Sequence, residues 1–194
     1  MKKFIIKVIS FILPLILAVI LAFLLPTTPR ASKSFLLSAN KKDSLLQNVP
    51  APRIIFVGGS NLSLGLNSKL IKDSLHLNPV NTALHAQIGL KFMMDNTLQY
   101  IKKGDIIVLV PEYHQYYRDL NSGSVELLRL IADVNMSKIS LLNFTQIRKL
   151  TLFIPQFVLS KYKITEYLKT KESDVYSVNS FNEFGDSYTH WHLK

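Results

Sequence analysis

RIIFVGGSNLSLG, residues 53–65, joins two segments whose apolar residues follow different spacings. Residues 54–57 are all apolar and lie between Pro52 and Gly58, a pattern that is typical of a short buried strand. The apolar residues that follow fit mostly one face of a helix that begins near Asn61, and they are Leu62, Leu64, Leu66, Leu70, Ile71 and Leu75. Gly-Gly-Ser-Asn, residues 58–61, therefore stands where a strand gives way to a helix.

The rest of the chain continues this alternation of strands and helices. NPVNTAL, residues 78–84, favours a weaker second strand, and GLKFMMDNTLQYIKKGD, residues 89–105, favours a helix that ends at Gly104. DIIVLV, residues 105–110, is the clearest strand, and because it is apolar throughout we expect both of its faces to be buried in a parallel sheet. The pattern is then helical to about Lys171. Together these features predict one α/β domain over residues 53–194.

The first 30 residues predict a membrane anchor, with the lipid bilayer as the partner of residues 8–25. Three lysines precede an uncharged run from Val8 to Leu25, which is about the length that crosses a hydrocarbon core as a helix. No small-x-small cleavage site ends the run, so we favour an uncleaved signal-anchor over a cleaved signal peptide. The basic end stays in the cytoplasm, which predicts a single-pass membrane protein with its domain on the extracytoplasmic, periplasmic side. Residues 31–52 are expected to form a tether, which VPAPR, residues 49–53, brings to an end.

Charge and cysteine content narrow the classes of function. The 194 residues contain 23 Lys+Arg and 13 Asp+Glu, and the net charge of +10 favours an acidic partner such as a lipid surface or an anionic glycan. We do not expect nucleic acid to be that partner, because the basic residues are scattered and the chain is predicted to be exported. The absence of cysteine excludes disulfides, thiolate metal sites and cysteine nucleophiles.

The Gly-Gly-Ser-Asn junction has two interpretations that the local residues leave open. In an open α/β sheet, ligands bind beyond the carboxyl ends of the strands, and a serine in a sharp turn there lies beside the free N–H groups of the next helix. Ser60 would then be a nucleophile. Serine and asparagine are also the commonest helix N-caps, so Ser60 and Asn61 could serve only to close a turn and cap a helix.

The junction resembles the first block of the SGNH (GDSL-type) hydrolase superfamily. That block is Gly-Asp-Ser after the first strand, followed by Asn or Ser and by a glycine a few residues on. It stands here as Gly58-Gly59-Ser60-Asn61 with Gly65 following, so that Gly59 replaces the aspartate of the family. The membrane-anchored branches that act on cell-envelope polymers resemble the chain best.

The later blocks of the family resemble the chain less well. Gly89 stands in the place of the oxyanion-hole glycine after the second strand, and Glu112 stands where the third block normally supplies an asparagine. The Asp-x-x-His block that supplies the general base is missing, because GDSYTHWHLK offers Asp186 and His190 at a different spacing. His114 is the internal candidate for the base. The missing block suggests that the 194 residues are the N-terminal portion of a longer protein.

The resemblance implies a fold and an activity. The fold would be a three-layer α/β/α sandwich of the flavodoxin-like type, with five parallel strands. The activity would be ester hydrolysis or O-acyl transfer without a cofactor, on an acyl ester or glycan substrate. Ser60 would attack the acyl carbonyl, the N–H groups of Ser60 and Gly89 would hold the oxyanion, and Glu112 would contact the substrate or the base. Asn61 and Tyr113 would contact the substrate. The departures from the family pattern leave an alternative, a non-catalytic anchored envelope protein that retains the fold.

Three further features have more than one interpretation. Tyr113, Tyr116 and Tyr117 form an aromatic cluster that suits either the apolar faces of sugars or core packing. His190 and His192 are too few to form a metal site, and no metal is predicted. IRKLTLFIPQFVLSKYK, residues 147–163, is too short to span a bilayer but has basic flanks. It could lie in a lipid interface, although we favour a helix packed on the sheet, because an α/β domain must cover its sheet.

Overall fold

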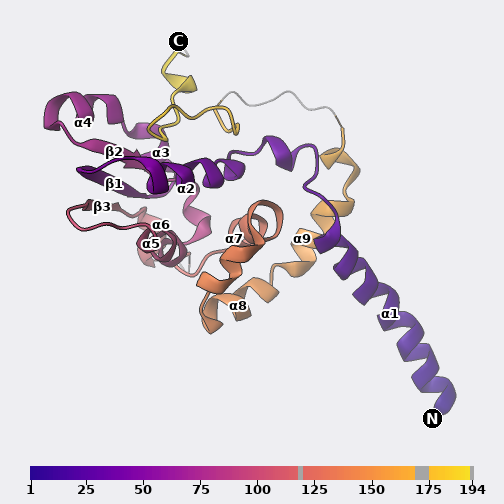
Figure 1. Ribbon diagram of the computed structural model, residues 1–194. Helices are drawn as coiled ribbons and strands as arrows, with labels where there is room; N and C mark the ends of the chain where they lie inside the picture. Colours follow the sequence, from indigo (N-terminus) through magenta and orange to yellow (C-terminus); the bar gives the residue numbers. More distant parts are fainter. Residues whose placement is uncertain (118–119, 169–174, 193–194) are drawn as a thin grey trace.

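The structure is a computed structural model that describes residues 1–117, 120–168 and 175–192 (Figure 1). The strands are β1 (Arg53–Gly58), β2 (Asn78–Asn81) and β3 (Ile106–Val110). The α-helices are α1 (Lys2–Leu24), α2 (Ser38–Asn48), α3 (Ser60–Gly65), α4 (Ser68–Leu75), α5 (Leu90–Leu98), α6 (Tyr113–Tyr117), α7 (Val125–Arg129), α8 (Phe144–Thr151) and α9 (Ile154–Tyr162). Shorter helical segments are η1 (Ala31–Lys33), η2 (Phe35–Leu37), η3 (Ala86–Ile88), the π-helical η4 (Leu130–Val134), η5 (Met136–Leu141), η6 (Ile164–Glu166) and η7 (Thr189–His192).

The three strands form one parallel sheet in the order β2-β1-β3. Ile55 of β1 pairs with Val80 of β2 on one side and with Ile107 of β3 on the other. The predicted strands and the mixed α/β class are therefore confirmed, although β2 ends at Asn81, three residues before the predicted end.

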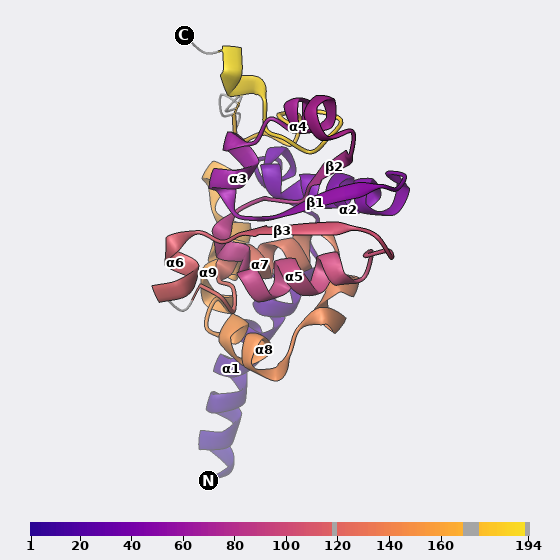
Figure 2. The ribbon, with the colours of Figure 1, turned by 90° about the vertical axis from the view of Figure 1, so that its left-hand side faces the viewer.

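β1 is buried along its whole length, because packed residues cover both of its faces. Ile55 and Val57 belong to the larger hydrophobic core, whereas Ile54 and Phe56 belong to a second cluster with Leu62. In Figure 2, α3 and α4 lie on one side of the sheet, and α5 and α7 lie on the other. A continuous apolar run suits a strand that is covered in this way.

β3 differs from the prediction, because most of its residues are exposed. Ile106 is 48% exposed and Leu109 is 44% exposed. Among the described residues β3 pairs with β1 alone, so it forms an edge of the sheet. The apolar run correctly predicts a strand, but the prediction that both faces are buried is wrong. The other edge strand, β2, is buried because α2 and α4 pack against it, whereas the main neighbour of β3 in the described part of the chain is β1.

Residues 31–52 fold into the domain, which corrects the predicted tether. Phe35 and Leu46 belong to the larger core, and Leu46 is fully buried in α2. The buried Lys42 Nζ donates hydrogen bonds to the carbonyl oxygens of Asn81, at 3.0 Å, and Gly185, at 2.7 Å. Burial lowers the pKa of Lys42 to about 7. The prolines that suggested a tether lie only at the end of the segment. Its earlier apolar residues pack into the core.

Two predicted helical stretches are interrupted. The helix expected after the junction is split into α3 and α4, because the side chain of Asn67 accepts the N–H of Leu70 and caps a new helix. After Pro111 the helices are short, and Asn143 and Gln146 form a capping box that starts α8. Residues 118–119 and 169–171 of the predicted helical region lie outside the described residues.

Residues 147–163 do not pack mainly on the sheet, contrary to our preferred interpretation. They form the end of α8 and all of α9, and the main neighbours of α9 are α1 and α7. Phe157 is fully buried, and its ring centroid lies 4.9 Å from that of Phe23 in α1. On this side the helices that pack on the sheet are α2 and α5 instead.

α1 is long and apolar enough to cross a membrane, which agrees with the predicted spanning segment. It projects from the rest of the molecule, and most of its side chains are exposed (Figure 1). The exception near its end is Ala22, which is fully buried against the domain. α1 and the domain are thus in direct contact.

Candidate functional site

The register of β1 and β3 brings two loops together at the carboxyl edge of the sheet. Gly58, the last residue of β1, pairs with Val110, the last residue of β3. Ser60 is the first residue of α3, which follows β1. Glu112 lies between β3 and α6. In open α/β sheets this edge is where ligands bind.

Ser60 and Glu112 are in direct contact. The Ser60 hydroxyl donates to Glu112 Oε1 at 3.0 Å, and the N–H of Asn61 donates to the same oxygen at 3.1 Å. Both distances are ordinary for hydrogen bonds. The sequence predicts separate roles for these three residues, and the structure brings them into one cluster. A carboxylate within this reach is positioned to take the proton of a serine.

Gly59 leaves the space that the carboxylate of Glu112 occupies. A Cβ atom at residue 59 would lie 2.3 Å from Glu112 Oε1 and 3.0 Å from the Cβ of Ala86. Any larger side chain there would displace the carboxylate from Ser60. The glycine is therefore a requirement of the contact between Ser60 and Glu112, and not only a turn residue.

Gln115 holds the backbone beside Glu112, a role that was not predicted from the sequence. Its Oε1 accepts the N–H of Glu112 at 2.8 Å, and its Nε2 donates to the carbonyl of Ala86 at 3.3 Å. The side chain is buried between the two loops. A signal was present in the sequence, because a glutamine three residues after Glu112 has the spacing of a capping box.

Gly89 does not offer the free N–H group that the resemblance implies. Its N–H donates to the carbonyl of Ala86 at 3.0 Å within a turn. Its φ of +92° is a conformation that favours glycine, and a Cβ there would lie 2.4 Å from the backbone nitrogen of Gly123. Gly89 therefore serves backbone packing, and the predicted oxyanion donor at this residue is corrected.

The tyrosines and the histidine that follow Glu112 face solvent. Tyr113, Tyr116 and Tyr117 are each about 70% exposed, which excludes core packing as their explanation. The ring centroids of Tyr113 and Tyr117 lie 4.5 Å apart. His114 is exposed as well, and no hydrogen bond links it to Ser60 in the described part of the chain.

Asp186 and His190, both within the described residues 175–192, do not form a hydrogen-bonded pair that could serve as the general base for Ser60. Asp186 is fully buried and accepts the N–H and hydroxyl of Ser68, at 2.8 and 2.7 Å, and the amide of Asn81 at 2.9 Å. It therefore fastens the C-terminal segment to α4 and β2. Nδ1 of His190 is buried and has no hydrogen-bond partner among the described residues.

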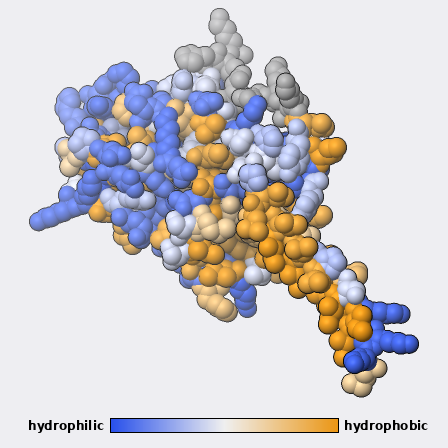
Figure 3. Space-filling model, turned by 45° about the vertical axis from the view of Figure 1, so that its right-hand side comes forward, coloured by the Kyte–Doolittle hydropathy of each residue, from blue (hydrophilic) through white to orange (hydrophobic). Residues whose placement is uncertain are grey.

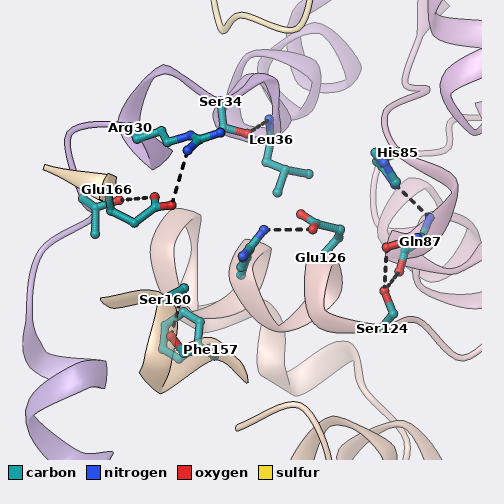
Figure 4. A network of polar contacts seen from close by, with 12 residues as sticks. Arg30, Ser34, Leu36, His85, Gln87, Ser124, Glu126, Phe157, Ser160 and Glu166 are labelled. Atoms are coloured by element: carbon teal, nitrogen blue, oxygen red, sulfur yellow. Dashed lines mark hydrogen bonds and ion pairs between the residues drawn. The ribbon is translucent and has the colours of Figure 1, made fainter. Parts of the chain in front are cut away.

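A cleft of about 530 Å³ lies in another part of the molecule, between the chain that follows α1 and helices α7 and α9. Figure 4 shows polar contacts around it, including Arg30 with Glu166 at 3.9 Å and Arg129 with Glu126 at 2.9 Å. Neither Ser60 nor any residue of α6 lines this cleft. The described residues contain no group of three or more His, Asp and Glu that could hold a metal ion.

Comparison of the chain with protein-family models, with curated proteins and with solved structures finds no match in any of the three. The function is therefore inferred from the geometry around Ser60.

Proposed function

We propose that the chain is a membrane-anchored serine ester hydrolase or O-acyltransferase with Ser60 as its nucleophile. The observation that carries the proposal is the hydrogen bond from Ser60 Oγ to Glu112 Oε1, at 3.0 Å on the carboxyl edge of a parallel sheet. A nucleophilic serine needs a neighbouring group that takes its proton. Glu112 fills that role in the proposal, where the sequence alone offered only a contact to substrate or to a missing base.

The proposed reaction is a transfer of an acyl group through Ser60. Ser60 Oγ forms a bond to the acyl carbon while Glu112 takes the hydroxyl proton. The alcohol of the ester then leaves with that proton, and the acyl group remains on Ser60. Water or a glycan hydroxyl attacks the acyl carbon in the second step, which gives a free acid or a new ester and restores the serine. The N–H of Ser60 is the proposed donor to the oxyanion.

This proposal retains the SGNH resemblance and revises one part of it. The aspartate of the family is replaced by Gly59, and a carboxylate from the third block lies in the space beside that glycine. With the resemblance we propose the finer fold, a three-layer α/β/α sandwich of the flavodoxin-like type, which the helices on both sides of β1 support. We also propose an extracytoplasmic domain that acts on acyl esters of envelope glycans, with exposed Tyr113 beside the substrate.

A second candidate is a non-catalytic anchored protein, and one observation favours it. α3 has no side-chain cap of its own, and the carboxylate of Glu112 accepts the N–H of Asn61 in its first turn. Glu112 would then cap α3 from the neighbouring loop, and Ser60 would only add a hydrogen bond to that cap.

Hydrolysis of p-nitrophenyl acetate by the full chain separates the two candidates. We expect Ser60→Ala to lower the rate about 100-fold or more and Glu112→Gln to lower it at least about tenfold, since general-base catalysis supplies factors of this size. Ser74→Ala, at an exposed serine of α4, is the matched control and should retain the full rate. A Ser60→Ala variant with an unchanged melting curve and an unchanged rate would favour the non-catalytic protein.

A further inference from the structure

α9 lies beside the membrane-spanning segment and not above it. The hydroxyl of Tyr162 donates to the carbonyl of Ala18 at 2.8 Å, and the rings of Phe157 and Phe23 are 4.9 Å apart. Ala18 lies six residues before Leu24, the end of α1, which is roughly 9 Å along the helix axis. If α1 crosses a bilayer, this part of α9 lies at the depth of its outer boundary.

The position of Tyr162 shows which face of α9 points along α1 toward the membrane. Leu159 and Pro155 precede it by three and seven residues, so the three side chains lie on one face of the helix. Leu159 is 70% exposed, and Leu152, in the turn just before α9, is 75% exposed. Phe157 lies on the opposite face and is fully buried. Leu152, Pro155, Leu159 and Tyr162 form what we call the α9 stripe.

The surface around the α9 stripe suits a lipid interface. In Figure 3 the apolar surface of α1 continues onto the part of the domain where α1 joins it. Contiguous exposed apolar surface on a protein commonly marks an interaction site. Lys163 is exposed directly after the stripe, and the side chain of Arg30 is 55% exposed where the chain leaves α1. Cations at this level attract anionic lipid headgroups.

We infer that the α9 stripe is immersed in the interface of the bilayer that α1 crosses. Lipid is the occupant because the contact between Tyr162 and Ala18 brings the stripe to the depth of the spanning segment. Since residues 31–52 are packed in the core, the anchor and the stripe together fix the orientation of the domain on the membrane. α3 and α6, which carry the Ser60 cluster, lie away from α1 in both ribbon views (Figures 1 and 2). This inference does not depend on the proposed function.

A single fluorescent label on the full chain tests the inference, because the chain contains no cysteine. Leu159→Cys is labelled with NBD, a fluorophore whose emission shifts to the blue in apolar surroundings. Leu70→Cys on α4 is the matched control, since Leu70 is 62% exposed and α4 lies far from α1 in Figure 1. Both proteins are reconstituted into vesicles of phosphatidylethanolamine and phosphatidylglycerol, with and without lipids that carry a spin label on the acyl chain.

We expect NBD at residue 159 to emit at shorter wavelength and to lose most of its intensity to the spin-labelled lipid. NBD at residue 70 should show neither effect and should be quenched by aqueous iodide. Equal emission and equal iodide quenching at the two positions would overturn the inference. A blue shift at 159 without lipid quenching, from a protein of dimer size in detergent, would also overturn it by assigning the stripe to a second copy. Leu152→Cys provides an independent repeat.

Discussion

β1 and β3 are joined by side chains at both of their ends, and the two ends differ in chemistry. At the amino end Arg53 and Asp105 form an ion pair whose side chains are both fully buried. At the carboxyl end Ser60 and Glu112 form a hydrogen bond of 3.0 Å, and both residues are partly exposed. Each pair joins residues that are 52 apart in the sequence.

At the amino end, hydrogen bonds satisfy the buried guanidinium of Arg53 and the buried carboxylate of Asp105. Arg53 donates to Asp105 Oδ1 at 2.9 Å and to the carbonyl oxygens of Leu46 and Tyr100, and Asp105 also accepts the N–H of Lys102 at 2.7 Å. The carboxyl end leaves its hydroxyl and carboxylate within reach of solvent. One pair of strands is thus joined by a buried ion pair at one end and by a partly exposed serine and carboxylate at the other.

The largest effect is expected from breaking the amino end. Asp105→Ala leaves the guanidinium of Arg53 buried without its counter-charge, and we expect a loss of about 3–5 kcal/mol in the free energy of unfolding. Asp73→Ala is the matched control, because it removes an exposed pair with Lys69 that is worth about 0.5 kcal/mol or less. Denaturant unfolding of the full chain in detergent measures both. Equal losses in the two variants would contradict the structural role given to the buried pair.

Acid should reduce the stability that the Arg53–Asp105 pair gives to the folded chain. The hydrogen bond from Arg53 holds the pKa of Asp105 below its ordinary value of 3.8. The unfolded chain then takes up the proton more readily than the folded chain, so the stabilisation is complete above that value and is lost as the pH falls through the folded pKa. The free energy of unfolding should therefore fall below about pH 4, and Asp105→Asn should make that fall shallower. Unfolding curves at several acidic pH values measure the slope for each protein.

Substitution of two neighbouring glycines at the carboxyl end should affect different properties, stability for Gly58 and ester hydrolysis for Gly59. A Cβ on Gly58 would lie 2.3 Å from the backbone oxygen of Val110, so Gly58→Ala should cost about 1–3 kcal/mol of stability. A Cβ on Gly59 meets only the movable end of Glu112 at that distance, so Gly59→Ala should cost less than about 1 kcal/mol. The Gly59 variant should instead lose ester hydrolysis. Melting curves and initial rates of both variants decide the matter, and a fully active Gly59→Ala would refute the need for the carboxylate.

The sequence predicted where the two ends lie but not how deeply they are buried. The apolar runs after Pro52 and after Gly104 gave the correct strands, and the residues that follow them gave Ser60 and Glu112. The packing of helices decides that β1 is covered on both faces and β3 is not, and no local pattern encodes which strand a helix packs against. The direct contact of Ser60 with Glu112 depends on the register between strands, which is equally non-local.

Other differences arise because one residue type serves several roles. Gly89 was assigned to an oxyanion hole from its place after the second strand, but its positive φ and the close approach of Gly123 explain it as a packing residue. Residues 31–52 looked like a tether because Pro50 and Pro52 dominate their end, although Leu46 fills the core. Such long-range packing is visible only once the chain is folded.

Only a small effect on stability is expected from Ser60→Ala. The substitution removes one hydrogen bond from a partly exposed hydroxyl, which should cost about 1 kcal/mol or less. A melting curve of the variant in detergent checks this value. A loss several times larger would mean that Ser60 serves mainly to hold α3 against the loop of Glu112.

Covalent labelling with a fluorophosphonate tests most directly whether the carboxyl end is reactive. The probe is incubated with the full chain, and the modified peptide is identified by mass spectrometry. We predict modification at Ser60, slower labelling of Glu112→Gln, no labelling of a folded Ser60→Ala variant, and unchanged labelling of Ser74→Ala. Labelling that Ser60→Ala leaves unchanged, or no labelling of the folded parent chain, would contradict the claim that Ser60 is a nucleophile activated by Glu112.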